Sequence, residues 1–287
     1  MANLKEIRNR IASVSSTMQI TSAMKMVSAA KLKKAQDAIT AMRPYADTLT
    51  KLIQNLSSAL EGDNQNPYTQ VRERKNVLII AITSNRGLCG AFNANIIKKT
   101  RQLIETTYSG ENVSLVTVGK KGSEVLRKTG KVQSRHDALF DELTYEKTAE
   151  LAQNVMNQFA QQEFDEVVLV YNRFKNAATQ IVEVEPFLPI VANASEETPL
   201  TTDYIFEPNK VEIVNQLLPK SLKMQLFKAL RDSFASEHGA RMTAMHKATD
   251  NATELRNQLK LTYNKARQAA ITNEILEIVG GAEALKG

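Results

Sequence analysis

Two short segments that contain glycine are the first candidates for chemistry in this sequence. Ser84–Ala91 (SNRGLCGA) and Gly119–Ser123 (GKKGS) each follow a run of apolar residues that predicts a buried strand. The carboxyl ends of strands in an open α/β sheet are where nucleotides commonly bind. Neither segment, however, has the spacing G-x-G-x-x-G or G-x-x-x-x-G-K-[ST] that cradles phosphate groups. We therefore interpret Gly87 and Gly90 as residues of a tight turn and Cys89 as a small buried apolar side chain. A nucleotide-dependent enzyme stays an alternative.

Paired carboxylates and metal ligands are the next candidates, and their positions argue against both. Adjacent acidic pairs fall at predicted loops or element ends, which predicts solvated charges: Asp141-Glu142, Asp165-Glu166 and Glu196-Glu197. His238 and His246 are eight residues apart, whereas two ligands on one face of a helix would be four apart. No nucleophile, base and orienting residue stand out as a set. We expect no catalytic residue, no cofactor and no metal site.

The middle of the chain, residues 76–194, alternates predicted strands with predicted helices. This order is typical of a Rossmann-like open α/β domain with right-handed crossovers. The predicted strands are residues 76–83, 113–118, 166–171 and an edge strand, 181–184, that Pro186 ends. The predicted helices are residues 91–108, 123–128 and 144–162. Polar linkers flank the domain at residues 61–75 and 195–202.

A long helix is predicted before this domain, over residues 1–60. From Leu4 to Leu60, apolar residues recur in alternating steps of three and four, which is the seam of a coiled coil over roughly eight heptads. At 1.5 Å per residue the helix would be on the order of 85 Å long, more than a compact domain needs. Pro44 predicts a kink or a local opening of the helical hydrogen bonds.

The apolar seam is interrupted once. Three successive seam positions carry polar side chains: Thr21, Lys25 and Ser28. The apolar residues of this stretch stand one position earlier: Ile20, Met24 and Val27. A straight helix drifts about 20° per heptad against a strict seven-residue repeat, so the shift predicts either a local unwinding of the supercoil or a functional contact.

Residues 208–287 predict a second long helix, and the α/β domain between the two helices makes the pair an antiparallel coiled coil. The second helix is longer by about ten residues, which leaves on the order of 15 Å of its end unpaired. Apolar residues cover most sides of this end: Ile275, Leu276, Ile278, Val279 and Leu285. A monomer rarely exposes such a patch, so we expect this tip to lie inside another protein.

The net charge of +6 is concentrated in the two long helices. Residues 1–60 hold nine Lys and Arg against three Asp and Glu, and residues 208–287 hold twelve against eight, whereas the part between them is acidic. A basic helix pair predicts an acidic partner: nucleic acid, a membrane surface or an acidic protein. A basic coiled coil that binds nucleic acid stays an alternative, although aromatic side chains are not interleaved with the basic ones, as stacking on bases requires.

Further features of the sequence bear on its location. No run approaches the ~20 apolar residues that a membrane span needs. The single cysteine excludes an internal disulfide and suits a reducing compartment. The N-terminus is amphipathic and poor in acidic residues, as transit peptides are, but the apolar seam already begins at Leu4. We therefore interpret the N-terminus as mature structure.

Several segments carry a resemblance to a known family. They include Ile7–Ile11 (IRNRI), Ile20–Val27 (ITSAMKMV), Arg86–Asn93 (RGLCGAFN), Glu237-His238, Arg241-Met242, Ala248–Ala252, Tyr263–Gln268 and Ile271–Ala284 (ITNEILEIVGGAEA). The last resembles a C-terminal signature of I-T-x-E, an acidic residue three positions later, and then G-A with a small or basic residue. In sequence and order, these segments resemble the gamma subunit of bacterial F-type, proton-transporting ATP synthases, and the resemblance covers the whole chain.

The resemblance implies that the chain is the rotor shaft of a central stalk. The paired helices would stand inside a ring of three alpha and three beta subunits. The α/β domain would lie with the epsilon subunit and the membrane ring of c subunits. Proton flow would turn the ring and shaft, and the shaft would drive each beta subunit through its nucleotide-binding states. The shaft would need neither an active site nor a membrane span, and would be bound peripherally at the cytoplasmic face of the inner membrane.

Site residues follow from the same resemblance and, in part, from charge. Met24 and Lys25 lie in the segment that the family associates with coupling to beta. Arg267, Gln268 and Thr272 lie in the C-terminal segment that the family places against beta. From charge alone we add three lysines that would meet an acidic lever loop of beta: Lys31, Lys33 and Lys34. The unpaired tip would turn in a bearing formed by the alpha and beta subunits: Ile275, Ile278, Val279 and Leu285.

Overall fold

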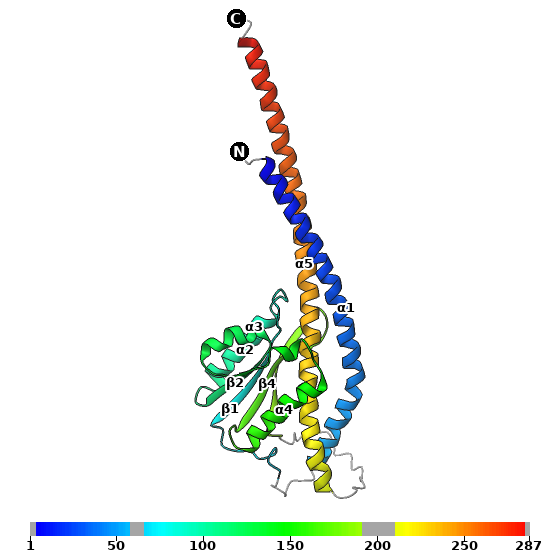
Figure 1. Ribbon diagram of the computed structural model, residues 1–287, viewed down its shortest axis with the longest axis vertical. Helices are drawn as coiled ribbons and strands as arrows, with labels where there is room; N and C mark the ends of the chain where they lie inside the picture. The colour runs from blue at the N-terminus through cyan, green and yellow to red at the C-terminus, as the bar shows by residue number, and fades with distance from the viewer. Residues whose placement is uncertain (1–3, 58–65, 191–209, 285–287) are drawn as a thin grey trace. The chain divides into compact units, whose positions relative to one another are not determined.

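The computed structural model describes residues 4–57, 66–190 and 210–284 (Figure 1). The chain divides into two compact units. The first consists of residues 1–28 and 242–287, and the second of residues 29–241. Within the described residues, the first unit is helical and the second contains a β-sheet. The predicted limits at residues 60, 194 and 208 lie outside the described ranges, so that division into segments stays a prediction.

Two long helices account for both ends of the chain, as predicted. α1 (Leu4–Ser57) and α5 (Lys210–Ala284) each contribute residues to both units. α1 continues through Pro44, and Thr48 Oγ1 donates a hydrogen bond to the Pro44 carbonyl at 2.8 Å. Pro44 therefore removes one backbone donor without ending the helix. Among the described helices, none is apolar enough over sufficient length to cross a membrane.

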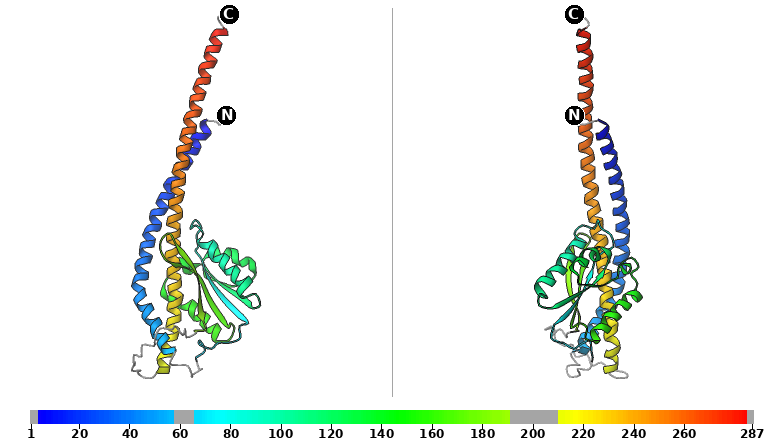
Figure 2. Two further views of the ribbon diagram at one scale, coloured as in Figure 1. Left: turned by 180° about the vertical axis from the view of Figure 1, so that it is seen from behind. Right: turned by 60° about the vertical axis from the view of Figure 1, so that its left-hand side comes forward.

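In the first unit, the segments of α1 and α5 lie side by side and run in opposite directions (Figure 2). Thr21 contacts Thr249, whereas Met18, which comes earlier in α1, contacts Thr253, which comes later in α5. This order of contacts confirms the predicted antiparallel pair within this unit. α5 continues beyond the N-terminal end of α1 (Figure 1), and its described residues from Ile271 onward are all exposed.

The second unit contains a five-stranded sheet in the order β3-β2-β1-β4-β5. Its strands are β1 (Asn76–Ile82), β2 (Asn112–Val118), β3 (Val132–Arg135), β4 (Glu166–Phe174) and β5 (Gln180–Leu188). The first four are parallel, and β5 pairs antiparallel with β4 at an edge. The central strand β1 is buried on both faces from Val77 to Ile82, as its continuous apolar run predicts.

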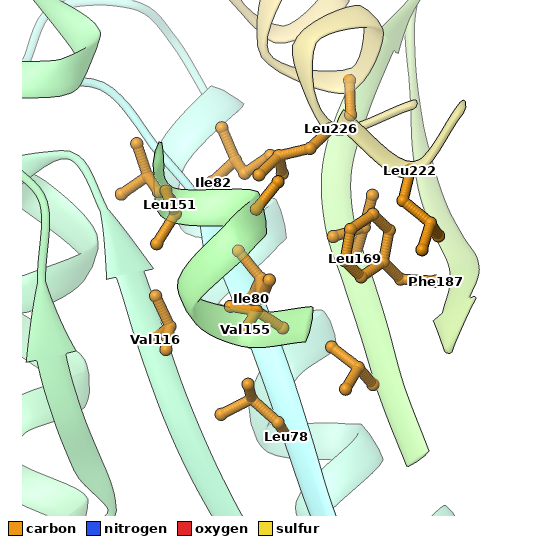
Figure 3. Packing of buried hydrophobic residues seen from close by; sticks show 14 of the residues in the cluster. Leu78, Ile80, Ile82, Val116, Leu151, Val155, Leu169, Phe187, Leu222 and Leu226 are labelled. Atoms are coloured by element: carbon orange, nitrogen blue, oxygen red, sulfur yellow. The ribbon is translucent and has the colours of Figure 1, made fainter. Parts of the chain in front are cut away.

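Helices cover both faces of this sheet (Figure 2). On one face, α4 (Tyr145–Ala160) and the part of α5 around Leu226 pack against Ile80 and Leu169 (Figure 3). On the other face, α2 (Phe92–Gln102), the π-helical turn that follows it and α3 (Lys120–Leu126) pack around Ile79 and Leu115. The unit is therefore a three-layer α/β fold, which together with the long helices confirms the predicted fold class.

Two details of the sheet differ from the prediction. β5 does not end at Pro186 but runs to Leu188. An edge strand tolerates proline because the missing N–H need not face the ladder, and the pairing with β4 shifts register beside Val168, the partner of Pro186. β3 is absent from the sequence prediction. Its four residues contain a single apolar side chain, Val132, so they carry too little periodicity to signal a strand.

Candidate functional site: the exposed faces of the helix pair

The first glycine-containing segment is a tight turn between β1 and α2. Ser84 Oγ donates a hydrogen bond to the Arg86 carbonyl at 2.7 Å. Gly90 has a φ of +61°, a conformation that favours glycine, and Cys89 is buried. Burial raises the pKa of the Cys89 thiol, which suits an inert packing residue. The interpretation of this segment as a turn with a buried cysteine is confirmed.

A guanidinium group from α5 occupies the carbonyl side of this turn. Arg241 donates hydrogen bonds to the carbonyls of Gly87 and Arg86 and to the carboxylate of Glu237. Both members of the ion pair are buried, and burial raises the pKa of Glu237 although Arg241 opposes the shift. The turn therefore presents carbonyl acceptors to a cation of the chain itself. A phosphate group would need N–H donors there instead.

The second glycine-containing segment, Gly119–Ser123, is explained by close packing against the end of β1. A Cβ atom at Gly119 would lie 2.1 Å from the Thr83 carbonyl oxygen, and one at Gly122 would lie 2.6 Å from Thr83 Oγ1. The Gly122 N–H also donates a hydrogen bond to Thr83 Oγ1 at 2.9 Å. These glycines allow two chain segments to approach each other, and neither is needed to admit a ligand.

One acidic pair has a structural role that the prediction of solvated charges misses. Asp165 accepts a hydrogen bond from the Asn76 N–H at 2.8 Å. Glu166 accepts one from the Tyr108 hydroxyl at 2.8 Å, and burial raises the pKa of that hydroxyl. Both partners are distant in sequence, so adjacency of the two carboxylates could not reveal them. The pair Glu196-Glu197 lies outside the described residues.

His238 packs as a buried aromatic ring. Neither of its ring nitrogens has a hydrogen-bond partner among the described residues, and its ring meets Phe234 edge-on with the centroids 4.5 Å apart. Burial lowers its pKa to about 4, with further contributions from Lys31, Arg241 and Arg86, so the imidazole is neutral at pH 7. In the part of the chain that the structure describes, no three His, Cys, Asp or Glu side chains cluster as metal ligands would.

The helix pair of the first unit keeps its seam where the sequence pattern is interrupted. Thr21 and Ser28 remain in the seam at 9% and 2% exposure, whereas Ile20 and Val27 are 57% and 58% exposed. Each buried hydroxyl donates a hydrogen bond to a carbonyl of its own helix, at 3.1 Å for Thr21 and 2.7 Å for Ser28. The seam therefore does not move to Ile20 and Val27, because satisfied hydroxyls can be buried without turning the helix, and a functional contact at this stretch stays a prediction.

This arrangement leaves apolar side chains on the outside of α1. Ile20, Ala23 and Val27 follow one another at helical spacing and are all exposed, and we call them the outer face. Met24 and Lys25, the residues predicted to couple to beta, are half-buried beside the seam. The sequence signal for Ile20 and Val27 was their place one position before the polar seam residues Thr21 and Ser28.

The lysines predicted from charge are exposed on α1, but two of them also serve the chain itself. Lys33 Nζ forms an ion pair with Asp37 Oδ1 at 2.9 Å. Lys31 lies close enough to Glu237 to favour its charged form. Lys34 is exposed as well.

The residues predicted on α5 are also exposed. Arg267 and Gln268 are adjacent, Thr272 lies one turn later, and Thr272 Oγ1 donates a hydrogen bond to the Gln268 carbonyl at 2.9 Å. In the tip, Ile275, Ile278 and Val279 expose more than half of their surface. Leu285 lies outside the described residues. Leu276, also expected at this end, and Ile271, which the prediction omits, are exposed and extend the same apolar surface.

The sequence matches known proteins over nearly its whole length. The family described as ATP synthase matches residues 3–285. An ATP synthase gamma chain from Flavobacterium johnsoniae is 69% identical over 287 residues, which is all of both chains. The chain belongs to the ATP synthase gamma chain family.

Solved structures of related assemblies share the fold of this gamma chain. A chain from the central stalk and c-ring of the Tetrahymena thermophila mitochondrial ATP synthase is 28% identical, with a TM-score of 0.62 over 80% of this chain and 99% of that chain. A chain from the OSCP, F1 and c-ring structure of the Euglena gracilis mitochondrial ATP synthase is 23% identical, with a TM-score of 0.72 over 98% of this chain and 94% of that chain. The second likeness concerns the fold alone.

Membership of the gamma chain family confirms the resemblance and the central-stalk function. It supports neither a nucleic-acid-binding coiled coil nor a separate nucleotide-dependent enzyme. The individual roles of Met24, Lys25, the α1 lysines, the α5 residues and the tip stay predictions.

Proposed function

We propose that this gamma chain acts as the rotor shaft by direct contact of its exposed helix faces with the alpha and beta subunits, and that it has no catalytic site of its own. The observation that carries the proposal is the burial pattern of the helix pair. A free helix pair is more stable when its apolar side chains are buried. This pair instead buries Thr21 and Ser28 and exposes Ile20 and Val27, as a pair does when a partner covers its outer face.

The shaft works through differences in contact energy. The outer face of α1 is apolar, whereas the neighbouring residue Lys25 is basic, so the shaft is not the same on all sides. At each rotation angle, a given beta subunit therefore meets a different set of contacts. Contacts that favour the open state of beta over its closed state shift the equilibrium between these two states. No chemical reaction on the shaft is needed for this shift.

The C-terminal stretch of α5 fits a bearing. Its exposed apolar residues point to most sides of the helix, so a surrounding collar of alpha and beta subunits would meet similar surface at every angle. Arg267, Gln268 and Thr272 precede this stretch and would contact beta just before the collar. Their exposed polar groups could then hold one rotation angle more firmly than another.

Further partners of the complex follow from the family. An acidic lever loop on beta would meet Lys25, Lys31 and Lys34, and Lys33 is the weaker candidate because Asp37 already pairs with it. The α/β unit would bind the epsilon subunit and the ring of c subunits, and a c-ring accompanies the central stalk in the Tetrahymena structure. The assembled complex would hold this chain peripherally at the cytoplasmic face of the bacterial inner membrane.

Native purification tests the assembly. The chain, carrying an affinity tag, should bring down an ATPase-active ring of alpha and beta subunits together with epsilon. A double variant that makes the outer face polar, Ile20→Ser with Val27→Ser, should fold as the wild type does but retain less of the ring. An active ring that is purified without this chain would contradict the proposal.

A charge reversal tests the coupling contact. Lys25→Glu should repel an acidic lever on beta, so that the number of protons pumped per ATP hydrolysed falls about fivefold in membrane vesicles. Lys98→Glu, which makes the same change at an exposed position of α2, is the matched control and should leave the ratio unchanged. An equal effect of both variants would mean that net charge, and not the position beside the seam, determines coupling.

A further inference from the structure

Hydroxyl groups form part of the contact between α1 and α5 in the first unit, where Met245 and Ala252 are buried as well. Thr21 Oγ1 and Thr249 Oγ1 lie 2.8 Å apart. Thr253 Oγ1 lies 3.3 Å from Met18 Sδ. Threonine hydroxyls therefore occupy positions where a coiled coil ordinarily places large apolar side chains.

Each of these hydroxyls also has a hydrogen-bond acceptor on its own helix. Thr249 Oγ1 donates to the Met245 carbonyl at 2.8 Å, and Thr253 Oγ1 donates to the Thr249 carbonyl at 2.8 Å. Thr21 Oγ1 lies 3.1 Å from the Met18 carbonyl. If the two helices move apart or past each other by a small amount, every hydroxyl proton still has an acceptor. The movement therefore leaves none of these hydroxyl donors without an acceptor.

A seam of large apolar side chains behaves differently. Such side chains interlock at the density of an organic crystal, and a shift opens a void that loses dispersion contacts on one side. Hydroxyls with local acceptors have no such locked position, because rotation about a single bond changes their partner.

We propose that residues 18–28 of α1 and 245–253 of α5 form a slip joint. In this joint the two helices shift against each other by exchanging hydrogen bonds between the helices for hydrogen bonds within each helix. The buried Ser28, whose hydroxyl bonds to the Met24 carbonyl, continues the joint by one heptad beyond Thr21. The shift changes how the outer face is presented and requires no unfolding of either helix.

Pulsed electron–electron spin resonance on the full-length chain tests the joint. Spin labels are placed at the exposed positions Arg8 on α1 and Lys247 on α5, which are offset along the pair so that an axial shift changes the distance between the labels. Cys89 is 1% exposed, so it is shielded from the labelling reagent. In the double variant Thr21→Val with Thr249→Val, the distribution of distances between the two labels should narrow about twofold. The hydroxyl contact allows an axial shift of about one residue's rise, 1.5 Å, whereas two interlocked valine side chains prevent it.

Matched variants separate the hydroxyl contact from other effects of valine. Thr17→Val with Thr262→Val changes two exposed threonines that also bond to carbonyls of their own helices, and should leave the distribution unchanged. Thr21→Ser with Thr249→Ser keeps both hydroxyls and should match the wild type. Val14→Thr adds a hydroxyl at a half-buried seam position and should broaden the distribution. A valine pair that leaves the distribution unchanged or broadens it, or a control pair that narrows it equally, would overturn the slip joint.

Discussion

Two stretches of α1 bury opposite kinds of side chain. In residues 18–28 the seam buries Thr21 and Ser28 and leaves Ile20 and Val27 outside, whereas farther along the same helix it buries apolar residues: Leu32, Ala35, Ile39 and Leu49. Helix propensity does not explain the difference, since both halves are continuous α-helix. The stretch from Leu32 to Leu49 therefore uses its apolar residues for the stability of this chain, whereas residues 18–28 present theirs to a partner.

The magnitudes support this division. Burial of an Ile or Leu side chain contributes about 1.5–3 kcal/mol, while a hydrogen bond between two hydroxyls contributes only about 0.5–1.5 kcal/mol net. Per seam position, the stretch with Leu32 and Ile39 is therefore the stronger one. The stretch with Thr21 is the weaker one, and it is also where exposed apolar surface remains.

Truncating an apolar side chain in each half gives the largest expected difference. Ile39→Ala should lower the free energy of unfolding by about 2–5 kcal/mol, since a buried side chain is removed and a cavity remains. Ile20→Ala removes the same atoms from an exposed position and should change the free energy of unfolding by about 0.5 kcal/mol or less. Urea unfolding followed by circular dichroism measures both values. Equal losses at the two positions would show that Ile20 is buried in the free chain.

Acid should weaken the stretch where α5 buries His238. The unfolded chain binds a proton at the ordinary pKa of 6.5, whereas the folded chain binds it only near pH 4. The unfolded state thus holds more protons in this window, so stability is complete above about pH 6.5 and falls as the pH is lowered toward 4. The loss is on the order of 3 kcal/mol, at 1.36 kcal/mol per unit of pKa.

Comparison with a variant isolates this effect from the titration of the carboxylates. The cations Lys31, Arg86 and Arg241 and the carboxylate of Glu237 surround His238, and all of them stay in place in His238→Phe. The urea midpoint of the wild type should fall more steeply between pH 6.5 and 4 than that of the variant. If the urea midpoints of the wild type and the variant fell in parallel, His238 would be protonated at a similar pH in the folded and the unfolded state.

Replacing the hydroxyls of Thr21 and Thr249 by methyl groups should have the smallest effect on stability. Replacement of both partners of a buried hydrogen bond by groups of the same shape is nearly neutral or stabilising. Thr21→Val with Thr249→Val should therefore raise the free energy of unfolding by about 1 kcal/mol at most, while the exposed pair Thr17→Val with Thr262→Val should leave it unchanged. A loss above about 2 kcal/mol would show that the hydroxyl contact holds the helices together strongly.

Much of the fold follows from periodicity. The buried strands β1, β2 and β4 carry continuous apolar runs, and the long helices carry three-four spacing, so both signals are strong. β3 could not be found because strand formation there depends on pairing with β2 and not on its own four residues. The length of β5 was underestimated because a proline is excluded only from strands that are paired on both sides.

The candidate site was only partly predictable. The exposed tip of α5 follows from the greater length of the second helix and from its apolar residues. The seam at Thr21 and Ser28 did not follow, because a count of apolar positions treats a threonine or serine as an interruption. A hydroxyl that bonds to a carbonyl of its own helix needs no water, and a sequence pattern does not show that bond. The role of Arg241 was likewise hidden, since the carbonyls that it binds lie in a turn about 150 residues earlier.

The exposed end of α5 also has a consequence for how the chain must be made. Ile271, Ile275, Leu276, Ile278 and Val279 form an apolar surface that has no cover within the described chain. Surfaces of this kind associate with one another when no partner is present. Copies synthesised in excess of their ring would therefore cluster through their C-terminal ends. Balanced production of the subunits, or prompt capture of each new chain, becomes a requirement that a single helix end imposes on the cell.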